Sequence, residues 1–157
     1  MPDLSHLNER GEARMVDVGA KQATHRRAVA TGQIILKPET VKLISQGIAK
    51  KGDVLAAARI AGIMAAKKTA DLIPLCHNIP ISQAAIDFEE MENGFKIIAS
   101  VETVAATGVE MEALTAVSVA SLTIYDMVKS VDRAAEIHGI RLLEKSGGKG
   151  GAFKREG

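Results

Sequence analysis

A carboxylate and an ammonium three residues apart, Asp126 and Lys129, are the clearest acid–base pair in this sequence. Helical spacing of apolar residues predicts a helix of about 20 residues from Glu110 to Lys129, and residues three apart on a helix share one face. Steps of four and three residues place Glu112 near that face, several turns earlier. A carboxylate beside an ammonium stays ionised and can exchange a proton when a substrate alters its surroundings. The ordinary alternative is a solvent-facing ion pair, with Glu110 simply favouring the positive helix end.

The segment Leu75-Cys76-His77 is a second candidate, because Pro74 and Pro80 enclose it. A rigid loop can present an imidazole for proton transfer. One Cys next to one His lacks the paired ligand spacing of a zinc site, and no sequence feature activates Cys76 as a nucleophile. A buried thiol beside a hydrogen-bonded His would account for the same residues without any chemistry.

Scattered basic residues form a third group that could bind phosphate. They are Arg26, Lys51, Lys67, Lys145 and Lys149. The glycine-rich tail is not a Walker A loop, since Leu143 stands where the first Gly should be and Gly150 replaces Ser or Thr. Glycine backbone with lysines could still close over phosphates, and a disordered soluble tail is the alternative.

These candidates need elements that position them, and the pattern predicts a single α+β domain over residues 1–157, with helices packed on an antiparallel sheet. The N-terminal ~20 residues and the Gly/Lys-rich tail are expected to be flexible. Gly62, inside a helix, indicates close packing. The expected elements are strands at 15–18 and 33–36, a helix from Pro38 to Gly47, a helix from Val54 to Lys68 capped by Asp53, strands at 84–89 and 95–105 joined at Asn93-Gly94, and a strand at 137–145.

Composition excludes several classes of function. The net charge is +1 and the chain has no Trp, one Tyr and three Phe, which argues against binding to nucleic acid or an anionic membrane surface. The single cysteine and the polar segment Met1–His6 indicate a cytoplasmic protein. The apolar stretches are expected to fall short of a membrane span. A core built from small aliphatic side chains suits an oligomer.

Taken together, several segments resemble one family, the cyclic pyranopterin monophosphate synthases, which are the C proteins of molybdenum cofactor biosynthesis. The resemblance runs along nearly the whole chain and keeps its spacing. The segments that carry it are Lys51–Val54, Ala58–Ile63, Asp71–His77, Thr107–Ala116, Leu122–Met127 and Lys145–Lys149.

The resemblance implies a ferredoxin-like α+β fold and a homohexamer, a trimer of dimers with active sites at dimer interfaces. It implies conversion of (8S)-3′,8-cyclo-7,8-dihydroguanosine 5′-triphosphate into cyclic pyranopterin monophosphate and diphosphate. The residues present require no metal or redox cofactor. The catalytic group would be Asp126, Lys129 and Lys51. The substrate-binding residues would be Leu75, Cys76, His77, Met111, Glu112, Glu110, Arg26, Lys145 and Lys149. The Lys149-Gly150-Gly151 ending departs from the family's common Lys-Ser-Gly.

Two other functions compete with this one. A non-catalytic oligomeric nucleotide-sensing module would use the same basic pocket but would not need the pair of Asp126 and Lys129. A cysteine hydrolase would depend on Cys76 and His77.

Overall fold

The structure, a computed structural model, describes residues 4–157. Met1–Asp3, which belong to the N-terminal segment expected to be flexible, lie outside the described residues. The elements in chain order are β1 (Thr24–Ile35), α1 (Pro38–Ser45), α2 (Val54–Lys67), α3 (Thr69–Leu72), β2 (Gln83–Met91), β3 (Gly94–Ala105), α4 (Glu110–Val128), β4 (Glu136–Ser146) and β5 (Phe153–Lys154).

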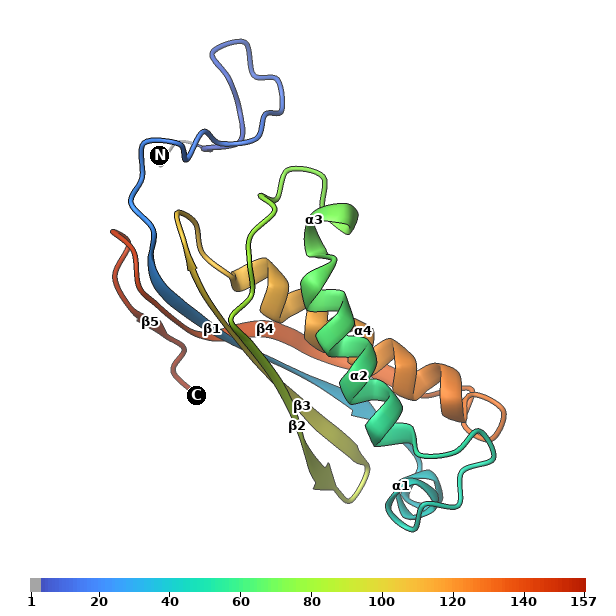
Figure 1. The fold of residues 1–157 in the computed structure, drawn as a ribbon. Coiled ribbons are helices and arrows are strands. Elements are labelled where there is room, and N and C mark those ends of the chain that lie inside the picture. Colours follow the sequence, from blue (N-terminus) through green and yellow to red (C-terminus); the bar gives the residue numbers. More distant parts are fainter. Residues whose placement is uncertain (1–3) are drawn as a thin grey trace.

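The strands form one antiparallel sheet in the order β2-β3-β1-β4-β5. Strand β1 is central and pairs with β3 along its whole length, from Thr24 opposite Ala105 to Ile35 opposite Gly94. The long helices α2 and α4 lie side by side on one face of this sheet (Figure 1). The single-domain α+β architecture expected from the sequence is therefore confirmed.

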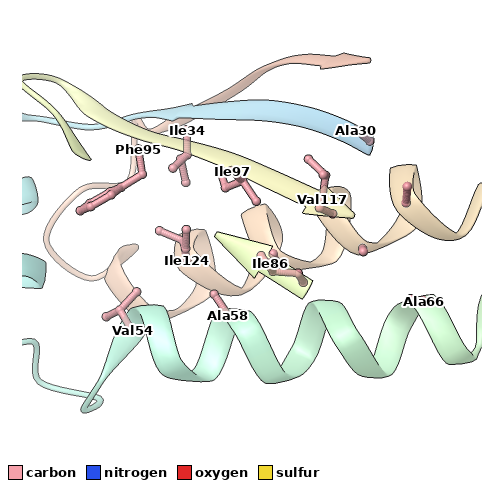
Figure 2. Packing of buried hydrophobic residues seen from close by; sticks show 14 of the residues in the cluster. Ala30, Ile34, Val54, Ala58, Ala66, Ile86, Phe95, Ile97, Val117 and Ile124 are labelled. Atoms are coloured by element: carbon pink, nitrogen blue, oxygen red, sulfur yellow. The ribbon is translucent and has the colours of Figure 1, made fainter. Parts of the chain in front are cut away.

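The hydrophobic core fills the space between the sheet and the two helices (Figure 2). Phe95 and Ile97 of β3 alternate inward, as a half-buried strand requires, and face Ile124 of α4. Each such fully buried side chain stabilises the fold by about 1.5–3 kcal/mol. This core therefore holds α4 firmly against the sheet. The candidate residues Glu110 and Glu112 lie at one end of this helix, and Asp126 and Lys129 lie at the other.

Gly62 lets α2 approach its neighbours closely, as the sequence predicted. A Cβ on Gly62 would overlap the side chain of Ile86 and lie 2.9 Å from the carbonyl oxygen of Ala116 in α4. The contact with backbone leaves little room for adjustment. The start of α2 also follows the prediction, because the side chain of Asp53 accepts a hydrogen bond from the N–H of Ala56.

Two expectations about local structure were wrong. Residues 15–18 form no strand, because no other described segment pairs with them. The strand expected at 33–36 is only the end of β1, whose residues Ala28–Gly32 are buried in succession and so show no alternation. The tail also contains the short strand β5, in which Phe153 pairs with Lys145, and the N–H of Arg155 donates to the Leu143 carbonyl.

Helix α4 also corrects the expectation that every apolar stretch is too short to span a membrane. By length and composition alone, Glu110–Val128 is the one helix of the described chain that could cross a bilayer. Core helices of globular proteins pass the same test, and the inner face of α4 is packed on the sheet.

The outer face of the helical layer is apolar. Ile60 and Met64 of α2, one turn apart, are 60% and 53% exposed. Leu122 of α4 is 56% exposed, and Met111 lies on the same stripe of that helix three turns earlier. An exposed apolar patch of this kind is typical of a protein–protein contact.

Candidate active site

The C-terminal end of α4 carries a carboxylate held between two ammonium groups. Lys129 Nζ lies 2.9 Å from Asp126 Oδ1, and Lys51 Nζ lies 3.4 Å from Oδ2. Lys51 also donates to the main-chain oxygen of Asp126 at 3.1 Å. Lys51 reaches this position because α2 begins where α4 ends, so the loop before α2 passes beside Asp126. The structure thus brings together the three residues expected to be catalytic.

The charges of these lysines set the protonation state of Asp126. Its hydrogen bond and charge interaction with Lys129, followed by those with Lys51, lower the pKa of the carboxyl group below its ordinary value. All three side chains are about half exposed. The group can therefore meet a ligand, and an ionised carboxylate between two proton donors can accept or return a proton.

A cavity of about 790 Å³ opens at the other end of the molecule, where α4 begins. Its charged lining residues are Lys21, Arg26, Glu110, Lys145 and Lys149, which leave a net formal charge of +3. The whole chain carries only +1. Positive charge is therefore concentrated in this cavity, which suits an anionic ligand such as a phosphate chain.

Backbone and side-chain contacts hold two of these cations in place. Arg26 Nε donates to the carbonyl of Ala105 at 3.0 Å and Nη2 donates to that of Ala106 at 3.2 Å. Lys145 Nζ lies 3.5 Å from Glu110 Oε1. Lys149 lies in the turn between β4 and β5, so the tail contributes to the cavity as the sequence analysis expected.

Glu112 and the Leu75-Cys76-His77 segment belong to this same end of α4. Glu112 is only 4% exposed, and burial together with the charge of Glu110 raises its pKa to about 7. Burial and the Glu112 carboxylate also raise the pKa of the Cys76 thiol. Because the thiolate is the reactive form, this environment does not activate Cys76 and disfavours the cysteine hydrolase.

The candidate residues therefore form two groups rather than one. The Asp126 group and the Glu110 cavity are separated by sixteen residues of α4, or about 24 Å. Within one chain, Asp126 does not meet His77 or Glu112. Lys67, at the end of α2, is exposed and does not line the cavity.

Two buried polar atoms near the start of α4 lack hydrogen-bond partners within the described chain. They are Oγ1 of Thr24, a cavity-lining residue at the start of β1, and Oε2 of Glu112. Nearly all buried polar side-chain atoms in folded proteins are hydrogen-bonded. Both exceptions lie toward the Glu110 end of α4, and only Thr24 lines the cavity itself.

Sequence reasoning missed the N-terminal contribution to this region. Ala20, Lys21 and Gln22 line the cavity, and the carbonyl of Val16 is hydrogen-bonded to His77 Nε2. Asp17-Val18-Gly19, a short turn sequence followed by a lysine, was the available signal.

No group of three or more His, Cys, Asp and Glu side chains within residues 4–157 is arranged to hold a metal ion. The donors present in the cavity are mainly ammonium, guanidinium and backbone groups, which suit phosphate oxygens rather than a cation.

Comparison with known proteins assigns the family. Residues 15–148 match the MoaC family. A cyclic pyranopterin monophosphate synthase of Thermomicrobium roseum is 58% identical over 158 residues, covering 99% of this chain and 95% of that protein. A Roseiflexus protein of the same name is 57% identical over 98% of both chains. Cyclic pyranopterin monophosphate synthase 1 of Mycobacterium bovis is 58% identical over 97% of this chain and 90% of its own. The chain therefore belongs to the MoaC family.

Proposed function

We propose that this protein is a cyclic pyranopterin monophosphate synthase of molybdenum cofactor biosynthesis. It would convert (8S)-3′,8-cyclo-7,8-dihydroguanosine 5′-triphosphate into cyclic pyranopterin monophosphate and diphosphate. The observation that carries this proposal is the identity of 57–58% to relatives of that name over nearly the whole chain. The proposed domain comprises residues 1–157, and the proposed localisation is cytoplasmic.

The two groups of residues suit the two parts of this reaction. Opening the purine ring and closing the pterin ring require proton transfers, for which Asp126, Lys129 and Lys51 supply an ionised base beside proton donors. Forming the cyclic phosphate makes a bond from a substrate hydroxyl oxygen to the α-phosphorus. The bond from that phosphorus to the departing diphosphate breaks, and the hydroxyl proton passes to a base. The cations of the cavity would stabilise the departing diphosphate.

The substrate would lie between the two groups. In this proposal Leu75, Cys76, His77, Met111 and Glu112 contact its ring system. Arg26, Lys145 and Lys149 contact its phosphates. Glu110 orients Lys145 through their ion pair.

A site shared between two copies of the chain would join these groups. A twofold axis crossing the middle of α4 would set the two α4 helices antiparallel, so the Asp126 end of one copy would face the Glu110 end of the other. The exposed apolar face with Ile60, Met64 and Leu122 supports a contact on this side. We propose such dimers as the units of a homohexamer.

We further propose that the fold is ferredoxin-like. With α2 and α4 as the two crossover helices, the element order is β-α-β-β-α-β, and α1, α3 and β5 are additions. This order and the sheet order β2-β3-β1-β4 support the description.

The direct test is to incubate the purified protein with the cyclic dihydro-GTP substrate and measure pterin and diphosphate together. Asp126→Asn should retain substrate binding and lose turnover by about 100-fold or more. The exposed Asp87→Asn is the matched control and should behave as the unaltered protein. Binding without turnover by the unaltered protein would instead favour the nucleotide-sensing module. Near-normal turnover of Asp126→Asn would contradict the assigned role.

A further inference from the structure

The turn between β4 and β5 contains two glycines that lie directly against the start of β1. Strand β4 ends at Ser146, which is opposite Arg27 of β1, so Gly147 and Gly148 follow beside that strand (Figure 1). Both glycines have positive φ, +91° for Gly147 and +76° for Gly148. Residues with a side chain rarely adopt this conformation. The course of the turn therefore favours glycine at both positions before any neighbour is considered.

The two glycines face different parts of β1. A Cβ on Gly147 would overlap the backbone carbonyl oxygen of His25. A Cβ on Gly148 would instead overlap Nη1 of Arg26, and it would lie 2.9 Å from Cζ and 3.2 Å from Nη2 of the same guanidinium. Gly147 thus contacts main chain, whereas the nearest neighbours of Gly148 are all atoms of one side chain that lines the cavity.

Arg26 is not free to move away from Gly148. The end of a long side chain usually shifts at little cost, but the guanidinium of Arg26 is tied to the main chain on its other side. Its Nε donates to the carbonyl of Ala105 at 3.0 Å, and its Nη2 donates to that of Ala106 at 3.2 Å. A methyl group at position 148 would push the guanidinium away from these carbonyls. The two carbonyls and Gly148 therefore fix the orientation of the guanidinium between them.

This orientation decides where the remaining donors of Arg26 point. A guanidinium has five N–H groups in a rigid planar fork, and the two carbonyls use one on Nε and one on Nη2. Glu110, which also lines the cavity, pairs with Lys145 rather than with Arg26. The donors that remain are thus available to a ligand, and a small rotation of the planar group would aim them elsewhere.

We propose that Gly148 is a positioning residue of the substrate site, which leaves the space that the guanidinium of Arg26 needs to keep its orientation. The inference rests on the proposed function, in which Arg26 contacts the substrate. It gives the glycine-rich turn a role other than flexibility, because the turn orients a side chain that belongs to a different strand.

The test compares Gly148→Ala with Gly151→Ala in the full-length protein, with the cyclic dihydro-GTP as substrate. Gly151 is a matched control, because it lies in the same connection with φ of +68° but has no atom within 4 Å of where its Cβ would lie. Gly148→Ala should lower kcat/KM by about 10-fold, as expected when one charge-assisted contact is misplaced. Gly151→Ala carries similar backbone strain and should stay within about 2-fold of the unaltered protein. Equal losses in the two variants would overturn the proposal.

A second substitution separates the added Cβ from the backbone strain. Asparagine tolerates positive φ better than alanine does, but it also carries a Cβ. Gly148→Asn should therefore impair turnover about as much as Gly148→Ala. Activity of Gly148→Asn close to that of the unaltered protein would show that only the backbone conformation matters, and it would overturn the proposal.

A double-mutant cycle shows whether Gly148 acts through Arg26. Once Arg26→Ala has removed the guanidinium, Gly148→Ala should lower kcat/KM by less than about 2-fold further, because nothing is left to displace. A purely structural role of the turn would instead give losses that multiply. Such independent losses would overturn the proposal, even if Gly148→Ala alone is impaired.

The affinity for inorganic triphosphate, measured by titration calorimetry on the same variants, separates this inference from the proposed function. If the unaltered protein does not turn over the substrate, but Gly148→Ala weakens triphosphate binding only when Arg26 is present, the proposed function fails and the positioning role stands. If the protein turns over the substrate and the losses of affinity and of kcat/KM are independent of Arg26, the proposed function stands and the positioning role fails.

Discussion

Glu110 and Asp126 lie near opposite ends of α4, separated by about 24 Å of a single straight helix. Glu110 borders the cationic cavity and pairs with Lys145, whereas Asp126 lies between Lys51 and Lys129. A small-molecule substrate cannot contact both residues of one chain. If both take part in one reaction, they must come from different copies, and this consequence can be tested.

Complementation between inactive variants tests the shared site. Asp126→Asn and His77→Ala should each have little activity alone. After unfolding and refolding together, half of the dimers would be mixed, and each mixed dimer would have one intact site. Activity should then return to about a quarter of that of the unaltered protein. A mixture that stays inactive, although mass spectrometry shows exchanged subunits, would mean that each site is built from one chain.

The two lysines should contribute unequally to the pKa of Asp126. Lys129 makes the larger contribution to lowering this pKa and Lys51 the smaller one. Lys129→Met should therefore raise the pKa of the Asp126 carboxyl group more than Lys51→Met does. Carbon-detected NMR titration of the labelled carboxyl group would measure both shifts. The reverse order would show that Lys51 is the main partner in solution.

Glu112 should make the stability of the protein fall as pH rises. Its pKa is about 7 in the folded protein against an ordinary value of 4.5, so the folded protein retains a proton that the unfolded chain has released. The free energy of unfolding should therefore decline between about pH 4.5 and 7, by up to about 3 kcal/mol from this residue. Glu112→Gln should remove this decline in urea denaturation at pH 5 and pH 8. The exposed Glu92→Gln should leave it unchanged.

Because Gly62 is closely packed, adding even a methyl group at this position should destabilise the protein. Gly62→Ala should lower the free energy of unfolding by about 1–3 kcal/mol, because the new Cβ would press on Ile86 and on the backbone of α4. Shortening the side chain of Ile86 should relieve part of this strain. The double variant with Ile86→Val should thus be more stable than the sum of the two single losses implies. If helix propensity dominated instead, Gly62→Ala would be stabilising by up to about 1 kcal/mol.

Removing the N-cap of α2 tests how firmly Lys51 is positioned. Asp53, which lies two residues after Lys51, accepts a hydrogen bond from the N–H of Ala56. Asp53→Ala should cost about 1 kcal/mol of stability. It should also lower turnover by loosening the loop that carries Lys51. Asp53→Asn, which keeps an accepting oxygen, should show neither effect to the same extent.

Local patterns were enough to predict the elements whose stability is largely local. The apolar spacing of α4, the Asp53 cap of α2 and the alternation in β3 each agree with the structure. Residues 15–18 looked like a strand but have no pairing partner. The length of β1 was underestimated, because its central residues are buried without alternation. Both errors have one cause, since strand formation depends on partners distant in sequence.

The sequence by itself determined which side chains could do chemistry, the helix that carries Glu110 and Asp126, and the family through its motifs. Only the tertiary structure decided which of those side chains meet. Lys51 contacts Asp126 across 75 positions of sequence, and His77 meets Val16 across 61. Packing of α2 against α4 and pairing of β1 with β3 create these contacts, because a long-range contact depends on how elements pack rather than on any local pattern. The length of α4 already separates Glu110 from Asp126, whereas only the packing decided that Lys51 joins Asp126 and that Lys145 joins Glu110.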